Sequence, residues 1–446
     1  MSAPPEAMFT TPEMAAAFSE AALVRQMLAF EAALARAQAA AGLVPPAAAE
    51  AIVAACGAEE PDLAALLGEA AAAGTPAVPL VRWLTARTAA AGRGFVHWGA
   101  TSQDAVDTAL VLQMRDGLGL LEGGLRDVAR ACAGLATRHR RTLMAGRTLL
   151  QHAVPVTFGL KAARWLAAAT RLLRRLRETR PRVLVVQFGG AAGTLAALGP
   201  DGLRVTELLA RELDLAVPDV PWHAERDRIG EVAGTLGVVA ATMGKIAGDL
   251  ALLSQTEVAE VSTGAQAGEG RSSAMPQKRN PVEAVAASAC ARLALGVVPV
   301  LLAAGVAEHE RGAGGWQAEW EALPALFRYT AGAVDWVRRA LVTLTVDEGR
   351  MAATLAAAGG LIMAEALAMA LAPQFGRDEA YRVVADICAR AARAGVNLRE
   401  AAAADDRVRA ALPAAALERA LDPAHYLGSA DAFIDRALAG FAEEPA

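Results

Sequence analysis

The chain has 446 residues, of which 54% are hydrophobic but only 4% aromatic, and it carries a formal net charge of −5. This length suffices for two or three domains with extensive buried apolar surface, and the abundance of Ala and Leu favours helices over strands. The weak negative charge, with no long run of Lys or Arg, argues against a nucleic-acid-binding protein and against electrostatic anchoring to a membrane.

The N-terminal ten residues contain no basic stretch followed by an apolar stretch, so no secretory signal is predicted and a cytoplasmic location is expected. The most apolar run, residues 293–307, is shorter than the ~20 residues that a bilayer-spanning helix requires. We interpret this run as a buried core helix. The four cysteines lie far apart without a C-x-x-C pair, which predicts neither a disulfide framework nor a zinc site.

Long helices are predicted in the middle of the chain. The first begins at Thr101 or Ser102, either of which can cap its N-terminus, and its apolar stripe continues at helical spacing to Leu135. The clearest periodicity lies at residues 229–261, where apolar residues alternate three and four positions apart, as in a bundle seam of roughly 50 Å. Further helices are predicted over residues 165–176, 282–307 and 322–344.

The predicted fold class is all-α, with three helical domains. The apolar run at residues 183–188 is too isolated to build a sheet, so no strand ladder is expected. We place an N-terminal helical domain at residues 1–99, a central long-helix bundle at residues 100–346 and a C-terminal helical domain at residues 347–446.

Three motifs hold many of the polar side chains that interrupt this alanine- and leucine-rich chain. They are H-W-G-A-T-S-Q-D at residues 97–104, G-R-T-L-L-Q-H-A at residues 146–153 and R-S-S-A-M-P-Q-K-R-N-P at residues 271–281. Because they lie far apart in the sequence, a common site requires either long helices that bring them together or contributions from different subunits.

The third motif has the composition of an anion-binding loop. Lys278, Arg279 and Asn280 come just before Pro281, which opens a predicted helix. Backbone N–H groups at a helix N-terminus attract carboxylates and phosphates, and Lys278 adds a positive charge. The alternative is an ordinary solvated loop, and the residue types alone do not decide between the two.

The ten residues S-S-A-M-P-Q-K-R-N-P at 272–281 resemble the mobile-loop signature of the fumarase/aspartase superfamily. The first and second motifs, in this order and spacing, resemble the other two signature regions, so the resemblance covers essentially the whole chain. It implies a homotetramer whose long helices form a shared bundle, with each active site assembled from three subunits. A small polycarboxylate is the implied substrate, and no cofactor is expected, since neither clustered Cys/His ligands nor a phosphate-binding glycine loop is visible.

Within the superfamily, the chain most resembles the cycloisomerases of protocatechuate breakdown, which implies ring closure of a tricarboxylate to a lactone. The segments that carry this resemblance are 146–161, F-G-G-A-A-G-T-L at 188–195, P-W-H-A-E-R-D-R at 221–228 and W-Q-A-E-W at 316–320. Adenylosuccinate lyases resemble the first and third motifs almost as well but typically carry a histidine where this chain has Leu149.

The resemblance also implies the roles of individual residues. It assigns proton transfer to Ser272, with Lys278 and backbone amides stabilising the alkoxide form of this serine. His152 is a possible acid or carboxylate ligand, and its alternative is a hydrogen-bonded helix histidine. The residues expected to bind the substrate are Thr101, Ser102, Arg147, Thr148, Gln151, Ser273, Asn280, Arg311 and His97.

Alternatives remain open for some of these residues. Thr101 and Ser102 also fit plain helix caps. Arg311 is the expected partner of a third substrate carboxylate, and its alternative is a surface ion pair with Glu310 or Glu308.

One residue departs from the superfamily pattern. Arg271 stands where glycine normally precedes the serine pair, and arginine cannot adopt positive φ angles as cheaply as glycine. This departure bears on the substrate more than on the superfamily. A related lyase that releases nitrite or an amine from a substituted succinate, or a paralogue without turnover, is therefore the alternative function.

Overall fold

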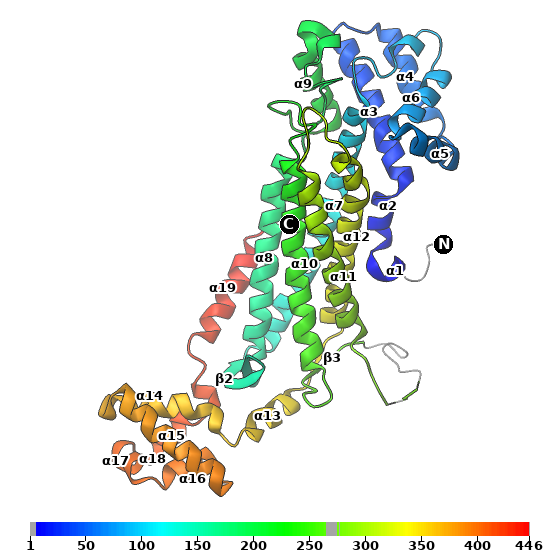
Figure 1. Cartoon of the computed structure of the whole chain (residues 1–446). Coiled ribbons are helices and arrows are strands. Elements are labelled where there is room, and N and C mark those ends of the chain that lie inside the picture. The colour runs from blue at the N-terminus through cyan, green and yellow to red at the C-terminus, as the bar shows by residue number, and fades with distance from the viewer. Residues whose placement is uncertain (1–5, 265–273, 276, 446) are drawn as a thin grey trace. The chain divides into compact units, whose positions relative to one another are not determined.

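The computed structural model describes residues 6–264, 274–275 and 277–445, and it is built almost entirely from helices (Figure 1). The N-terminal elements are α1 (Glu6–Phe9), α2 (Pro12–Ala17), α3 (Glu20–Ala40), α4 (Pro46–Ala58), α5 (Leu63–Ala73), α6 (Ala77–Arg87) and the 3₁₀ helix η1 (Arg93–Phe95). The long helices are α7 (Ser102–Arg138), α8 (Phe158–Val183), α10 (Asp227–Leu253), α11 (Val282–Ala304) and α12 (Gly315–Val342). Between α8 and α10 lie η2 (Ala196–Asp201) and α9 (Gly202–Leu213).

Short helices complete the chain after α12. They are α13 (Glu348–Ala357), η3 (Leu361–Met363), α14 (Ala364–Phe375), α15 (Arg377–Ala394), α16 (Leu398–Ala403), α17 (Asp406–Ala411), α18 (Ala414–Ala420), η4 (Pro423–His425) and α19 (Ala430–Ala442). The all-α fold class is confirmed.

Contacts divide the chain into two compact units. The first unit comprises Met1–Leu125, Leu172–Gly244 and Ala286–Trp336, and the second comprises Arg126–Arg171, Lys245–Val285 and Val337–Ala446. Their boundaries fall inside α7, α8, α10, α11 and α12, so each long helix contributes residues to both units. The division into three domains at residues 99 and 346 stays a prediction.

The core of the first unit forms around α3. This helix begins after Ser19, whose hydroxyl accepts a hydrogen bond from the backbone N–H of Ala22 at 3.1 Å and so caps it. Its buried face packs against α4 and α9. Phe30 is fully buried there, with its ring centroid 6.5 Å from that of Phe188. This packing fixes the segment that follows α8, which belongs to the candidate site below.

The C-terminal part of the second unit has a core of its own. Helices α14 and α15 pack against each other, and α16, α17 and α18 join them. Leu367, Ile387 and Leu398 are fully buried in this cluster. A buried aliphatic side chain contributes about 1.5–3 kcal/mol relative to an exposed one, so these three residues contribute substantially to its stability.

The prediction that the chain forms no strand ladder is wrong at the second motif. Strands β1 (Leu143–Thr148) and β2 (Gln151–Thr157) pair antiparallel, with Thr148 opposite Gln151 at the tip. The connecting residues Leu149 and Leu150 both have positive φ, at 51° and 62°. Two-residue hairpin turns of this kind usually carry Asn or Gly, which tolerate positive φ, so two leucines gave no turn signal. A second, two-residue pair joins β3 (Val261–Ser262) to β4 (Thr345–Val346).

The long helices largely follow the predicted periodicity. Helix α7 begins at Ser102, as predicted, and α8, α11 and α12 occupy the expected regions. The helix predicted over residues 229–261 ends earlier, at Leu253, and Val261 belongs to β3 instead.

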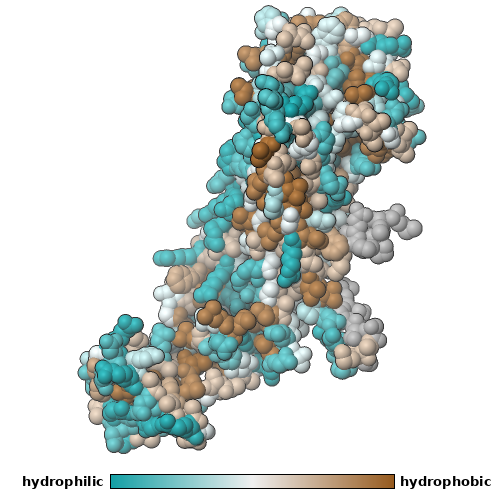
Figure 2. All heavy atoms as spheres, in the orientation of Figure 1, coloured by the Kyte–Doolittle hydropathy of each residue, from teal (hydrophilic) through white to brown (hydrophobic). Residues whose placement is uncertain are grey.

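The interpretation of residues 293–307 as a buried core helix is wrong for the single chain. Exposed apolar residues run along α11 and just beyond it: Leu293 (40%), Leu295 (42%), Val300 (46%), Leu302 (53%) and Val306 (80%). Figure 2 shows hydrophobic residues gathered over the long helices. The side of α11 that carries these residues is therefore not covered within the single chain.

Candidate active site

The start of α7 supplies the first group of predicted site residues. Thr101 precedes the helix, and its backbone N–H donates to Asp104 Oδ2 at 3.0 Å, which is one half of a capping box. The Thr101 hydroxyl accepts instead from Arg311 Nη1, at 3.2 Å. Asp104 therefore caps this helix end, and the Thr101 hydroxyl lies beside a guanidinium.

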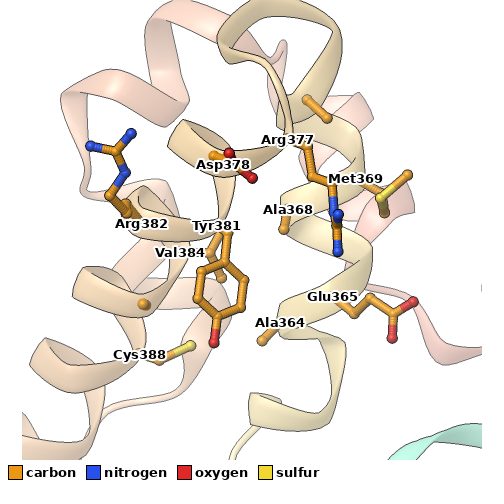
Figure 3. Close-up of a pocket in the computed structure, with 12 residues that line it drawn as sticks. Ala364, Glu365, Ala368, Met369, Arg377, Asp378, Tyr381, Arg382, Val384 and Cys388 are labelled. Carbon is orange, nitrogen blue, oxygen red and sulfur yellow. The ribbon is translucent and has the colours of Figure 1, made fainter.

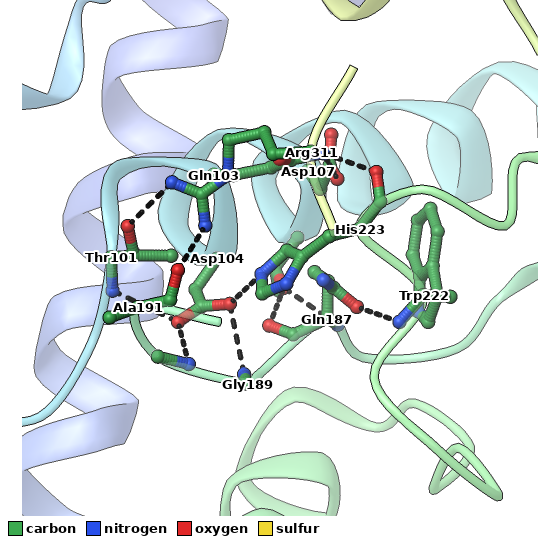
Figure 4. Close-up of polar contacts among 12 residues, drawn as sticks. Thr101, Gln103, Asp104, Asp107, Gln187, Gly189, Ala191, Trp222, His223 and Arg311 are labelled. Carbon is green, nitrogen blue, oxygen red and sulfur yellow. Dashed lines mark hydrogen bonds and ion pairs between the residues drawn. The ribbon is translucent and has the colours of Figure 1, made fainter. Parts of the chain in front are cut away.

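Asp104 connects three segments that are distant in the sequence (Figure 4). Its Oδ1 accepts from the N–H of Gly189 at 3.0 Å and contacts His223 Nε2 at 2.7 Å. Its Oδ2 accepts from the N–H of Gly190 at 3.0 Å in addition to Thr101. Both Asp104 and His223 are buried. Burial strengthens such charge-assisted hydrogen bonds because little water competes for them.

The glycine at position 189 is required by close packing. A Cβ atom there would lie 2.7 Å from Pro221 Cβ and 2.8 Å from His223 Cε1. Real side chains essentially never approach so closely, so a larger residue would push His223 away from Asp104. The glycine pair of the 188–195 motif therefore allows two loops to meet.

A buried ion cluster lies one turn further along α7. Arg226 forms bidentate hydrogen bonds with Asp107 and with Glu319, and all three side chains are at most 2% exposed. Trp316 Nε1 donates to Asp107 Oδ1 at 2.8 Å. Burial raises the pKa of Glu319. The hydrogen bond and charge of Arg226 lower this pKa, whereas the charge of Asp107 raises it, and the net shift is upward.

His97 is held by a buried acid. Its Nδ1 lies 2.5 Å from Glu31 Oε1, and the Glu31 side chain is only 1% exposed. Burial lowers the pKa of His97, but Glu31, through its charge and hydrogen bond, and Asp104 together raise it above its ordinary value. His97 is therefore biased toward imidazolium, a form that binds carboxylates.

Arg311 joins two of these segments. Its guanidinium donates to the Thr101 hydroxyl and, from Nη2, to the carbonyl of Ala191 at 3.2 Å. These partners of Arg311 are a hydroxyl and a carbonyl, not the carboxylates of Glu310 or Glu308 that the alternative required. Glu308 instead accepts from the backbone N–H of Ala313 at 2.8 Å. The first unit thus brings Thr101 and Arg311 together.

The second motif forms the hairpin of the second unit. Arg147 binds Glu260 through two hydrogen bonds of 2.8 and 2.7 Å, and Glu260 is fully buried. Thr148, Gln151 and His152 are exposed at the tip, with His152 opposite Arg147. His152 lies on β2, so its alternative as a helix histidine is wrong.

Only part of the third motif is described. Ser272, Ser273 and Arg271 lie outside the described residues. Lys278 is exposed, and Asn280 is partly buried just before α11 begins at Val282. The predicted helix start after Pro281 is confirmed.

A cationic cluster lies on α8 and α10 within the second unit. Asp249 accepts from Trp165 Nε1 at 3.0 Å and from Lys245, and its Oδ2 lies 3.9 Å from Lys161 Nζ. Burial lowers the pKa of Lys161; Asp249 opposes this, while neighbouring cations add to it. The pKa of Lys161 is lowered overall, so the Asp249 carboxylate offsets only part of the cost of burying this lysine.

A cavity of about 910 Å³ lies between α14 and α15 (Figure 3). Its lining includes Glu365, Met369, Tyr381 and Cys388 but none of the predicted site residues. Size alone therefore does not identify the active site, which the clustered polar residues indicate better.

Within the described part of the chain, no group of three or more His, Cys, Asp or Glu residues is arranged to hold a metal ion. We expect dialysis against EDTA to leave the turnover rate of the purified protein within about 2-fold of its original value. A loss of activity that an added divalent ion restores would contradict this prediction.

Sequence reasoning missed Asp104 as a member of the site. In the sequence Asp104 is only the last residue of the first motif, and nothing indicates which distant groups meet its carboxylate. The available signal was the position of Asp104 three residues after Thr101, which is the spacing of a capping box.

Comparisons with known proteins agree with these motifs. Residues 6–296 match the model of a family described as lyase, and residues 360–437 match that of the adenylosuccinate lyase C-terminus. A 3-carboxy-cis,cis-muconate cycloisomerase of Pseudomonas aeruginosa is 49% identical, covering 99% of this chain and 98% of that protein. A nitrosuccinate lyase of Streptomyces davaonensis is 43% identical, covering 95% of this chain and 92% of that protein. The crystal structure of a 3-carboxy-cis,cis-muconate lactonizing enzyme from Pseudomonas putida matches with a TM-score of 0.92 and 46% identity over 98% of each chain.

Proposed function

This chain belongs to the lyase family whose model spans its residues 6–296, and from this premise we propose that it is a cycloisomerase that interconverts 3-carboxy-cis,cis-muconate and 4-carboxymuconolactone. The observation that carries the proposal is the 49% identity to a cycloisomerase of this name along 99% of the chain.

Ring closure requires one bond to oxygen and one proton on carbon. A substrate carboxylate attacks the far carbon of a conjugated double bond, and the electron pair moves onto the neighbouring carbon as an enolate-like intermediate. Ser272 then delivers its proton to that carbon, which completes the lactone. The resulting alkoxide is stabilised by Lys278 until it regains a proton from solvent.

The attacking group also explains the residue at position 149. A carboxylate is already ionised at pH 7, so closing the lactone requires no base to remove a proton from the nucleophile. Leu149 can therefore replace the histidine that is typical of adenylosuccinate lyases. His152 remains available as an acid or a carboxylate ligand.

The other site residues are proposed to hold the three substrate carboxylates. In the first unit these are His97, Thr101, Ser102 and Arg311, and the contact between Arg311 and Thr101 supports their acting together. In the second unit they are Thr148, Gln151, Ser273 and Asn280. Arg147 is proposed to join them from β1, where Glu260 holds its guanidinium in place.

A nitrosuccinate-type lyase is the second candidate, supported by the 43% identity to such an enzyme. Both substrates carry two carboxylates on adjacent carbons. They differ in the reacting group: a carboxylate attacks in 3-carboxy-cis,cis-muconate, whereas nitrite leaves from nitrosuccinate. Purified protein mixed with 3-carboxy-cis,cis-muconate should abolish the ultraviolet absorbance of the conjugated diene. No absorbance change with this substrate, together with release of nitrite from nitrosuccinate, would favour the second candidate.

We propose that four copies of the chain form the active enzyme in the cytoplasm. By length and composition α10 and α11 are apolar enough to cross a membrane, but burial against other copies accounts equally for their exposed apolar residues. Light scattering in buffer without detergent should give about four times the 45.9 kDa chain mass. A stable monomer would contradict both the tetramer and a site shared between subunits.

A further inference from the structure

The Asp104 carboxylate is saturated with hydrogen-bond donors. Each oxygen faces two nitrogens: Oδ1 meets Gly189 N–H and His223 Nε2, and Oδ2 meets Thr101 N–H and Gly190 N–H, all between 2.7 and 3.0 Å. Three of the four are backbone donors that cannot turn away. An ionised carboxylate accepts at both oxygens, which matches this set of donors.

An amide in the same place cannot make these contacts. Asn has the shape of Asp, but its NH₂ group would face at least one backbone N–H, donor against donor. A buried donor left without an acceptor is costly. Asp104→Asn is therefore expected to release either the pair Gly189 and His223 or the pair Thr101 and Gly190.

The same two segments that Asp104 fixes also hold Arg311. Asp104 binds the backbone at Thr101 and at Gly190, while Arg311 binds the Thr101 hydroxyl and the carbonyl of Ala191, which follows Gly190. The separation of these two acceptors determines where the guanidinium lies. Asp104 thus acts on Arg311 through the backbone, without touching it.

We propose that Asp104, locked by His223, is a positioning residue that sets the guanidinium of Arg311 for a carboxylate of the substrate. The inference rests on the proposed function, in which Arg311 binds the third carboxylate of 3-carboxy-cis,cis-muconate. His223 supplies the one side-chain donor of the set, and Gly189 leaves the space that His223 needs.

Steady-state kinetics test the proposal. Asp104→Asn should raise the KM for 3-carboxy-cis,cis-muconate by about 10-fold or more and change kcat by less than about 3-fold, because it weakens binding in the ground state and transition state alike. The matched control is Asp116→Asn, the same substitution at an exposed position of α7, which should leave both constants unchanged.

A double-mutant cycle separates positioning from general destabilisation. If Asp104 acts through Arg311, the Asp104→Asn/Arg311→Ala variant should have a KM within about 2-fold of Arg311→Ala alone. If the increases in KM of the two single variants multiply in the double variant, the proposal is overturned.

If Asp104→Asn does not fold, His223→Gln and His223→Leu replace it. Gln keeps an N–H donor and should give a near-normal KM, whereas Leu should raise KM. Equal values for the two would also overturn the proposal.

Amide hydrogen exchange gives a readout that does not need the reaction. In the absence of substrate, Asp104→Asn should speed exchange by about 10-fold or more in peptides containing Thr101 or Gly189–Gly190, and Asp116→Asn should not. Unchanged exchange would refute the positioning role. If the wild-type protein fails to turn over the substrate but Asp104→Asn still speeds exchange, the proposed function is refuted, whereas the positioning of the backbone by Asp104 stands.

Discussion

Replacement of Ser272 by alanine is expected to lower kcat for 3-carboxy-cis,cis-muconate by at least about 10²-fold, the lower range for general acid–base catalysis. The hydroxyl supplies the proton that carbon receives after ring closure, and alanine has no proton to give. Because the loss falls on the chemical step, substrate binding should change little. Stopped-flow absorbance measurements of single turnovers would separate binding from chemistry.

Ser273→Ala is the matched control for this prediction. The Ser273 hydroxyl is proposed to contribute one hydrogen bond of ~1 kcal/mol to substrate binding. Its loss should therefore lower kcat/KM several-fold rather than hundred-fold. Incorporation of solvent deuterium at the α-carbon of the lactone should fall with Ser272→Ala in step with turnover. If the two variants behave alike, another group carries the proton, and Arg271 is the first residue to test.

Arg226→Ala is expected to lower the apparent free energy of unfolding by about 3–5 kcal/mol, because removing one partner of a buried ion pair leaves an uncompensated charge. Here two carboxylates, Asp107 and Glu319, would lose their bidentate partner inside the first unit. Urea denaturation at one fixed protein concentration measures the effect, since association also contributes to apparent stability.

The control is an ion pair near the surface. Arg182 binds Glu231, with side chains 57% and 31% exposed, and ion pairs this exposed to solvent contribute little to stability. Arg182→Ala should therefore shift the urea midpoint only slightly. Equal shifts for Arg182→Ala and Arg226→Ala would contradict the importance of the buried cluster.

The helical framework was predictable because apolar spacing repeats over many turns. Helix α7 begins at Ser102, as the capping residues Thr101 and Ser102 indicate. The hairpin β1–β2 was not predictable, because Leu149 and Leu150 occupy positive-φ positions without the residues that normally signal such a turn. A tight turn can be predicted from sequence only when the residues that favour it, such as Gly, Asn or Asp, are present.

The site was predictable at its motifs but not in its connections. Sequence spacing placed Thr101 at the start of α7, yet left open whether it caps the helix, since capping and ligand binding need the same hydroxyl. The structure places Asp104 in the capping role and Arg311 beside the hydroxyl. These contacts join residues up to 210 positions apart, and periodicity carries no information at that range.

The same limit applies to α11. Its apolar composition indicates burial but not what buries it. A helix that packs inside its own chain and one that packs against other copies have the same kind of sequence. Only the folded chain shows that Leu302 and Val306 are exposed rather than buried within it.

The ratio of kcat/KM for 3-carboxy-cis,cis-muconate to kcat/KM for nitrosuccinate tests the proposed function most directly, because it compares transition-state binding of the two candidate substrates in one protein. We predict a ratio above about 10³, with the lactone as product and no nitrite released beyond the background rate. A ratio below one, or turnover of neither substrate by the correctly assembled protein, would contradict the account.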